Sequence, residues 1–142
     1  MSTRLFMVAI HVKDIKSMAA FYRDVLGFET DWDGRGSWAE FKNRGVFFAM
    51  YERATLEEHL GTLTYPSGPN GTFSLAIDLP RFEDVDAFFE RAEAGGAVPI
   101  GRPGGPNEGG LAMRAAWIAD PEGNLIEISS WNGKYDEEGN LR

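Results

Sequence analysis

Few residues of this chain can do acid–base, nucleophilic or metal chemistry. Its 142 residues include two histidines, His11 and His59, and no cysteine. Without cysteine there is no disulfide, no thiolate nucleophile and no thiolate metal site such as a zinc ribbon. Two histidines far apart in the sequence do not complete a set of nucleophile, base and acid, so the residues support no named reaction. We expect His11 to be a strand-end residue whose imidazole bonds to a backbone carbonyl, rather than a catalyst.

The elements that carry these residues come in two copies. Residues 8–22 (VAIHVKDIKSMAAFY) and 75–89 (LAIDLPRFEDVDAFF) share one apolar pattern at a constant offset of 67. A second match, between GVFFAM at 45–50 and GNLIEI at 123–128, lies at an offset of 78. Two copies of one unit in a short chain indicate a fold whose site lies between them.

Each copy has the pattern of a β-α-β-β-β unit. A mostly apolar run predicts the first strand, at 6–12 and again at 73–79. The spacing that follows predicts a helix, with Asp14 as N-cap and an end near Leu26 in the first copy. Gly27 ends that helix, and Gly95 and Gly96 end its counterpart. Alternating residues then predict strands at 28–31, 37–41 and 46–51 in the first copy and at 97–100, 113–119 and 125–130 in the second.

The remaining segments connect these units. Residues 52–71 contain a possible short helical turn at 56–60, followed by YPSGPNG, and are interpreted as a linker. The stretch RPGGPNEGG at 102–110 is too rich in glycine and proline for a regular element, and serves as a passive loop or a mobile flap over the site. We therefore predict a single domain over 1–142, with module one at about 4–53, a linker at about 54–71, module two at about 72–131 and a frayed polar tail at 132–142.

Composition narrows the class of protein. A hydrophobic content of 43% allows one real core and no independent second domain. A net charge of −8 argues against a nucleic-acid partner, since phosphate binding needs a basic face. The apolar stretches are too short to span a bilayer, and the N-terminus lacks the pattern of a signal peptide, so we expect no membrane partner and a cytoplasmic protein.

Two motifs carry a resemblance to a known family. VKDIKSMAAFYRDVLGF at 12–28 and DPEGNLIEI at 120–128 resemble the vicinal oxygen chelate superfamily, which is the glyoxalase, bleomycin-resistance and extradiol dioxygenase group. The resemblance covers nearly the whole chain. It implies an α+β fold of two tandem β-α-β-β-β modules that form a curled mixed-sheet cup with helices packed on the outside. It does not imply one activity, because the superfamily includes isomerases, dioxygenases, epimerases, thiol transferases and drug-binding proteins.

The resemblance also implies where a metal would bind. Metal-dependent members place one ligand on each of four strands, and these positions correspond here to Met7, Ala49, Ser74 and Glu127. Only Glu127 is a usual ligand for a divalent metal, and a catalytic ion needs about three protein ligands. His11 shares a strand face with Met7 but lies about 13 Å along the strand from it, too far to replace it. We therefore expect no metal and no other cofactor.

Glu127 is thus the candidate catalytic residue. Strand alternation places it on one face with Ser129 and Trp131. Its carboxylate either binds a cationic ligand group or acts as a general base with a pKa raised by burial; alternatively, it is a structural group bonded to neighbouring strands. The candidate ligand-binding residues, all expected on strands around the cup, are Met7, His11, Phe47, Ala49, Tyr51, Ser74, Trp117, Ser129 and Trp131.

An aromatic cup with one carboxylate suits an apolar or planar cationic small molecule, although such rings also simply fill a core. The missing metal ligands and the aromatic cup favour a protein that binds and sequesters a small molecule, as resistance proteins do, or a metal-independent enzyme of this superfamily. The alternative is a metal-dependent lyase or isomerase similar to glyoxalase I, or a dioxygenase, with a divalent metal held by other residues or by a partner chain. A second alternative is a ligand-free interaction domain. The resemblance further implies a homodimer, with the cup closed within one chain or between two.

Overall fold

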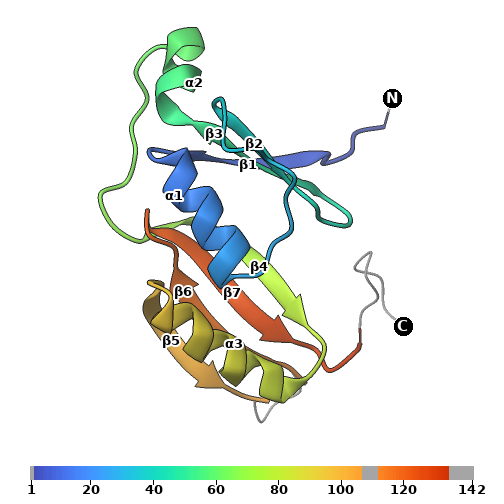
Figure 1. Cartoon of the computed structure of the whole chain (residues 1–142). Helices are drawn as coiled ribbons and strands as arrows, with labels where there is room; N and C mark the ends of the chain where they lie inside the picture. Colours follow the sequence, from blue (N-terminus) through green and yellow to red (C-terminus); the bar gives the residue numbers. More distant parts are fainter. Residues whose placement is uncertain (1, 107–111, 135–142) are drawn as a thin grey trace. The chain divides into compact units, whose positions relative to one another are not determined.

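The computed structural model describes residues 2–106 and 112–134 and divides the chain into two compact units, Met1–Tyr65 and Pro66–Arg142 (Figure 1). The boundary between the units lies inside the linker predicted at 54–71. Each unit combines one sheet with helices, so the predicted α+β class is confirmed. Among the helices of the described residues, none is long and apolar enough to cross a membrane.

The first unit is built on a three-stranded sheet in the order β1-β3-β2. Its elements are β1 (Met7–Val12), α1 (Ile15–Ala20), a π-helical turn (Phe21–Val25), β2 (Trp38–Phe41), β3 (Phe47–Glu52) and α2 (Arg53–Leu60). Strand β1 runs parallel to β3, and β2 runs antiparallel to β3. Parallel neighbours cannot be joined by a tight turn, so the chain crosses over through α1 and returns through β2.

The predicted ends of the first helix are confirmed. The Asp14 carboxylate caps the helix by accepting a hydrogen bond from the Ser17 amide at 3.1 Å. At the other end the chain leaves the helix at Gly27, whose φ of 82° lies in the left-handed region that glycine adopts readily. These two local signals decide where β1 ends and where the segment toward β2 begins.

The strand predicted at 28–31 is wrong: it is reduced to a single bridge between Glu29 and Lys42. The ring of Phe28 turns into the core and packs edge-to-face on Tyr22 at 5.5 Å between centroids. The Thr30 hydroxyl then donates to the carbonyl of Glu40 at 2.5 Å, so a side chain bonds to the edge of β2 where a fourth strand would supply a backbone amide.

The helix that follows β3 is longer than predicted. The sequence predicts a short turn at 56–60, whereas α2 starts at Arg53. None of its residues is fully buried, which is why it has no strong apolar periodicity in the sequence. Long-range contacts of Arg53 help to hold it: Nε donates to the carbonyl of His11 at 3.0 Å, and the guanidinium carbon lies 4.1 Å from the centroid of the Tyr65 ring.

The second unit is built on a four-stranded sheet in the order β4-β7-β6-β5. Its elements are β4 (Asn70–Leu79), α3 (Phe82–Ala94), β5 (Val98–Gly104), β6 (Arg114–Ala119) and β7 (Asn124–Ser130). Strand β4 is parallel to β7, and the other two pairs are antiparallel. This is the predicted β-α-β-β-β order, with boundaries shifted by at most a few residues.

One segment of this unit contradicts the sequence prediction. The sequence predicts no regular element from Arg102 onward, yet β5 continues to Gly104. The strand lies at the edge of the sheet, where Pro99 and Pro103 are tolerated because one side of the strand needs no ladder hydrogen bonds. Its pairing with β6 is irregular, as the register shifts twice along the strand. Residues 107–110 of the predicted loop or flap, and the tail beyond 134, lie outside the described residues.

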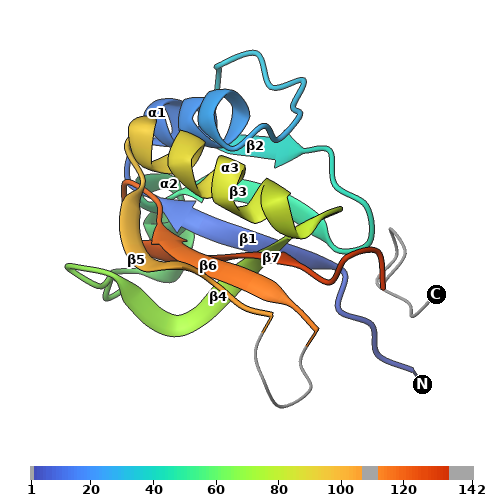
Figure 2. The ribbon, with the colours of Figure 1, turned by 90° about the horizontal axis from the view of Figure 1, so that it is seen from below.

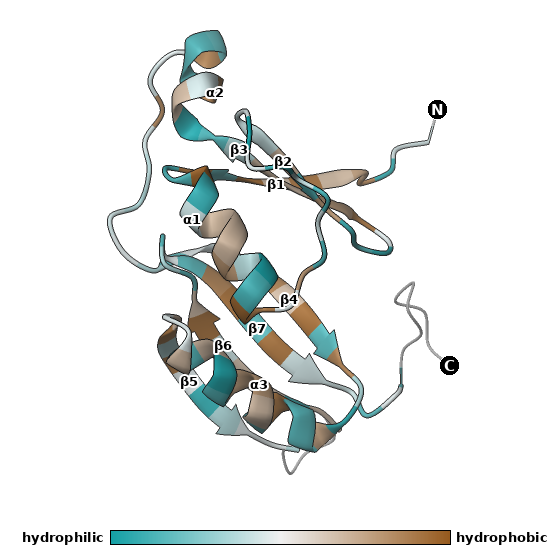
Figure 3. Cartoon of the chain, in the orientation of Figure 1, coloured by the Kyte–Doolittle hydropathy of each residue, from teal (hydrophilic) through white to brown (hydrophobic). Residues whose placement is uncertain are grey.

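The core of the second unit lies between the sheet and α3, which packs against one face (Figures 1 and 2). Val85, Phe89 and Ala92 form the buried stripe of the helix. Every second residue of β6 and β7 faces them, and apolar and polar residues are interleaved along β4 and β7 (Figure 3). The buried strand residues on this face are Ala116, Ile118, Ile126 and Ile128. The alternate residues therefore face away from α3.

A polar turn sets the register of β6 and β7. Asp120 is 1% exposed, and its Oδ1 accepts hydrogen bonds from the amides of Glu122 and Asn124 at 2.9 and 3.0 Å. Its Oδ2 accepts from the Asn124 side chain at 2.8 Å. A buried carboxylate satisfied in this way holds the hairpin in one geometry. The turn thereby places Glu127 directly opposite Trp117 in the ladder.

Replacing Gly123 by alanine tests the close approach at the start of β7. Gly123 has a φ of 88°, and a Cβ there would lie 2.5 Å from the carbonyl oxygen of Gly68. Gly45 has a similar φ of 82° but open space around it, so Gly45→Ala is the matched control. We expect Gly45→Ala to lower the free energy of unfolding by about 1–2 kcal/mol through φ alone, and Gly123→Ala by roughly 3 kcal/mol or more. Urea denaturation measures both, and equal losses would contradict the close approach.

Candidate functional site

In the first unit, five of the predicted site residues share the face of the sheet that is turned away from α1. The ladder pairs Met7 with Phe47 and His11 with Tyr51. On β3, Ala49 lies between Phe47 and Tyr51. Their neighbours Ile10 and Val12, which point the other way, are buried. This face carries an aromatic ring at each end of β3. Between the two rings it carries the small side chain of Ala49, which is fully buried.

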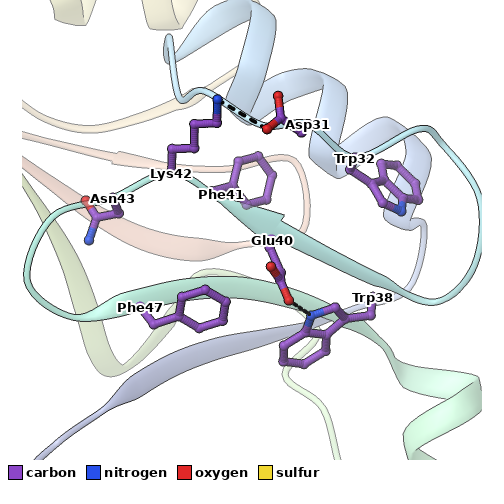
Figure 4. Close-up of a pocket in the computed structure, with 8 residues that line it drawn as sticks. All are labelled: Asp31, Trp32, Trp38, Glu40, Phe41, Lys42, Asn43 and Phe47. Carbon is purple, nitrogen blue, oxygen red and sulfur yellow. Dashed lines mark hydrogen bonds and ion pairs between the residues drawn. The ribbon is translucent and has the colours of Figure 1, made fainter.

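A hollow of about 410 Å³ lies at the β2 side of this unit (Figure 4). Its lining residues are Asp31, Trp32, Trp38, Glu40, Phe41, Lys42, Asn43 and Phe47. Glu40 is held in place because its Oε1 accepts a hydrogen bond from Trp38 Nε1 at 3.0 Å. At the rim, Lys42 Nζ lies 3.2 Å from Asp31 Oδ2. The hollow therefore combines aromatic walls, one exposed ion pair and one carboxylate bonded to an indole.

Of the predicted site residues, Phe47 alone lines this hollow. Sequence reasoning missed Glu40, although a usable signal was present: alternation along 37–41 places Glu40 and Trp38 on one face. Glu40 is also the ladder partner of Ala49. The position where the resemblance expects a ligand on β3 is thus filled by a methyl group, and a carboxylate stands opposite it on β2.

His11 does not take part in the hollow. Its side chain is exposed, and the hydrogen bond at this residue is accepted by its own backbone carbonyl from Arg53 at 3.0 Å. Partial burial, helped by the positive charge of Arg53, lowers the pKa of the imidazole, so the ring is mainly neutral near pH 7. The predicted bond from the imidazole to a carbonyl is not found among the described residues. His59 lies apart on α2 and is exposed.

In the second unit, the predicted residues Ser74, Trp117, Glu127 and Ser129 lie on the face of the sheet turned away from α3. Glu127 has Ala76 on one side and Trp117 on the other. Within the part of the chain that the structure describes, Glu127 forms no ion pair. Partial burial without a compensating cation raises its pKa. The pKa of Glu127 is therefore raised, as the burial hypothesis predicts, and the cause is desolvation of the carboxylate.

A second carboxylate, which was not among the predicted site residues, shares this face. Asp78 is the ladder partner of Ser129, one diagonal step from Glu127, and burial raises its pKa as well. The period of two along β4, which joins Asp78 to Ser74, was the available signal. Ser129 itself is 3% exposed, and its hydroxyl donates to the carbonyl of Ile77 at 3.4 Å, which gives it a structural partner.

Trp131 lies one residue beyond the end of β7, and not within the strand as the expected alternation requires. Strand β7 ends at Ser130, so alternation no longer governs where Trp131 points. The Ser130 hydroxyl accepts a hydrogen bond from the amide of Asn132 at 3.1 Å, which turns the chain immediately after the strand. The Lys134 ammonium lies 5.7 Å from the centroid of the Trp131 ring.

The residues do not fit the metal site that the resemblance implies. A thioether at Met7, a methyl at Ala49 and a hydroxyl at Ser74 do not replace imidazole and carboxylate ligands for a hard or borderline cation. Across residues 2–106 and 112–134, no group of three or more histidine, aspartate or glutamate side chains could hold a metal ion.

Comparison with known protein families gives one matching family model, which is described as the glyoxalase/bleomycin resistance protein/dioxygenase superfamily and matches residues 4–128. The uncharacterized protein YraH of Bacillus subtilis (strain 168) is 26% identical over 126 residues, which cover 88% of this chain and 96% of YraH.

Solved structures are similar over most of their length. A glyoxalase-related enzyme from Fulvimarina pelagi has a TM-score of 0.79 at 22% identity, covering 99% of this chain and 98% of its own. A glyoxalase/bleomycin resistance protein/dioxygenase family enzyme from Burkholderia phytofirmans PsJN has a TM-score of 0.75 at 27% identity. The match covers 90% of this chain and 98% of the chain of that enzyme.

The raised pKa of Glu127 makes stability depend on pH. The ordinary value is 4.5, and the folded state holds the proton more tightly than the unfolded chain does. The free energy of unfolding therefore falls as pH rises from below 4.5 through the folded pKa. Glu127→Gln removes this dependence on pH. The free energy of unfolding of the variant should therefore rise relative to that of the wild type as pH increases from 4.5 through the folded pKa, and the difference should stay constant at higher pH.

Urea denaturation at closely spaced pH values, from below 4.5 to neutrality, measures this difference. Glu90→Gln, which neutralises an exposed carboxylate on α3, is the control. A difference between wild type and Glu127→Gln that does not change with pH would show that Glu127 titrates normally.

Proposed function

Because the chain belongs to the glyoxalase/bleomycin resistance protein/dioxygenase superfamily, we propose that it binds a small molecule, either to sequester it or as an enzyme that needs no metal. One observation carries this proposal: of the four positions where the resemblance places metal ligands, only Glu127 has a ligating side chain. The other three residues lie on the same sheet faces but supply a thioether, a methyl and a hydroxyl.

Glu127 is the proposed anchor for the ligand. Its carboxylate stands next to the indole of Trp117, in a place where partial burial raises the pKa. A carboxylate beside an aromatic ring favours a ligand with a cationic or hydrogen-bonding group attached to an apolar body. A raised pKa also lets the group accept or donate a proton nearer to neutral pH, which a general base or acid requires.

Other residues on these faces would supply apolar contact. In the first unit these are Met7, Phe47 and Tyr51, and Trp38 packs edge-to-face on Tyr51 at 5.4 Å. In the second unit Ser74 is exposed and offers a hydroxyl, whereas the hydroxyl of Ser129 already has a partner. The proposed ligand is therefore mainly apolar or aromatic, with few polar groups.

Metal analysis and ligand screening test the proposal together. Protein purified without a histidine tag or a chelator should contain only trace metal by inductively coupled plasma mass spectrometry. In a thermal-shift screen of apolar and cationic compounds, at least one compound should raise Tm, and Glu127→Gln should reduce that rise. Glu90→Gln, an equal change of charge on α3, should leave the rise intact.

The opposite results have equally definite meanings. Near-stoichiometric zinc, nickel, manganese or iron would contradict the metal-free proposal and favour a metal-dependent lyase, isomerase or dioxygenase with ligands at other positions. Trace metal together with no thermal shift across the panel would favour a ligand-free interaction domain.

We also propose that the protein is a homodimer. In the described residues, β1 pairs only with β3 and β4 pairs only with β7, which leaves one edge of each strand open to another chain. Phe73 on β4 is 49% exposed and offers an apolar side chain for contact with a second chain. Light scattering after size-exclusion chromatography should give twice the 15.7 kDa of one chain, and Phe73→Asp should shift the mass toward one chain. A wild-type mass of 15.7 kDa would contradict the proposal.

A further inference from the structure

We infer that the hollow beside β2 is a subsite for a planar aromatic monocation, such as an amidinium or a protonated nitrogen heterocycle, with Glu40 as its counter-ion. The inference rests on the proposed function, since it names a class of small molecule for a face that carries predicted site residues. It assigns a role to Glu40, Trp38 and Trp32, and the geometry of these three residues carries the argument (Figure 4).

The charges in the hollow select a cation. Asp31 is paired with Lys42, whereas Glu40 forms no ion pair with any residue that the structure describes. Oε1 of Glu40 accepts one hydrogen bond from Trp38, so Oε2 is the oxygen left to receive a ligand donor. An amidinium or a protonated ring nitrogen would satisfy it with a charge-assisted hydrogen bond. An anionic ligand would be repelled by the same carboxylate.

The aromatic walls select a flat ligand. Trp38 is held by its bond to Glu40 and by edge-to-face packing on Tyr51 at 5.4 Å. Phe47 stacks on Phe6 with centroids 5.8 Å apart and an interplanar angle of 6°. Trp32 is fixed on its own side, because its Nε1 donates to the carbonyl of Arg35 at 2.7 Å. Rings fixed in this way offer cation–π and stacking contact at little further cost in side-chain entropy.

The size and the rim of the hollow limit the ligand further. A volume of about 410 Å³ is near the lower end of the range for small-molecule pockets and suits one or two fused rings. Lys42 and Asp31 neutralise each other at the rim, so the carboxylate of Glu40 is left to balance a single positive charge on the ligand. The expected ligand is therefore small, flat and singly charged.

Benzamidine, with its neutral isostere benzamide, tests this inference. The chain has four tryptophans, and two of them, Trp32 and Trp38, line the hollow. Four indole N–H signals in a ¹H–¹⁵N spectrum can be assigned with single Trp→Phe variants. Titration with benzamidine should shift the signals of Trp32 and Trp38 with one common affinity, and any shift of Trp117 would report the separate Glu127 site of the second unit. Benzamide should bind at least about tenfold more weakly, because it lacks the charge.

Matched variants separate Glu40 from the general charge of the protein. Glu40→Gln should weaken benzamidine binding by about tenfold, whereas Glu29→Gln should have no effect, since Glu29 is an exposed carboxylate of the same unit outside the hollow. Trp38→Phe keeps an aromatic ring but loses the N–H that orients Glu40, and should weaken binding by about threefold.

Four results would overturn the inference: equal binding of benzamidine and benzamide, shifts confined to Trp117 and Trp131, unchanged affinity in Glu40→Gln, or absence of binding at millimolar concentrations. The signals of Trp32 and Trp38 and the Glu40→Gln variant report on the first unit, while the thermal shift of Glu127→Gln reports on the second. Either proposal can therefore fail while the other stands.

Discussion

The register of one parallel strand pair in each unit is the constraint on which the other features depend. Pairing of β1 with β3, and of β4 with β7, turns one set of alternate residues toward a helix and the other set away from it. A slip of one residue would exchange the two faces, exposing Ile126 and Ile128 and burying Glu127 against α3. The apolar face must therefore stay in place, and this requirement also holds the polar and aromatic residues of the opposite face in their positions.

The two units use this shared geometry differently. In the second unit the carboxylate is on β7 at Glu127 and the aromatic ring stands opposite it on β6 at Trp117. In the first unit the equivalent position on β3 is Ala49, and the carboxylate stands opposite it on β2 at Glu40. Each unit thus places a carboxylate next to an indole on this face, and the second unit carries Asp78 there as well. A repeated fold can exchange the strand that carries a charge and still keep that charge on the same face.

The donor types on these faces bear on function more than the fold does. The fold is common to enzymes and to proteins named for drug resistance, so membership in the superfamily selects neither. A carboxylate with no cation nearby and a raised pKa costs stability, and such groups are found more often where a ligand or a proton supplies the missing interaction. This cost is the physical basis for proposing a binding role for Glu127, whereas the role proposed for Glu40 rests on its bond to Trp38 and its place in the hollow.

The sequence by itself determined the features that depend on local spacing. Period-two and period-3.6 patterns located most of the strands and helices, Asp14 marked a helix start, and Gly27 marked its end. The tertiary structure alone decided the rest. The ring of Phe28 and the hydroxyl of Thr30 replaced a predicted strand, β5 continued through prolines because it lies at a sheet edge, and Glu40 entered a hollow beside Trp38. These outcomes depend on contacts between residues distant in sequence, and local spacing carries no information about such contacts until the strands pair.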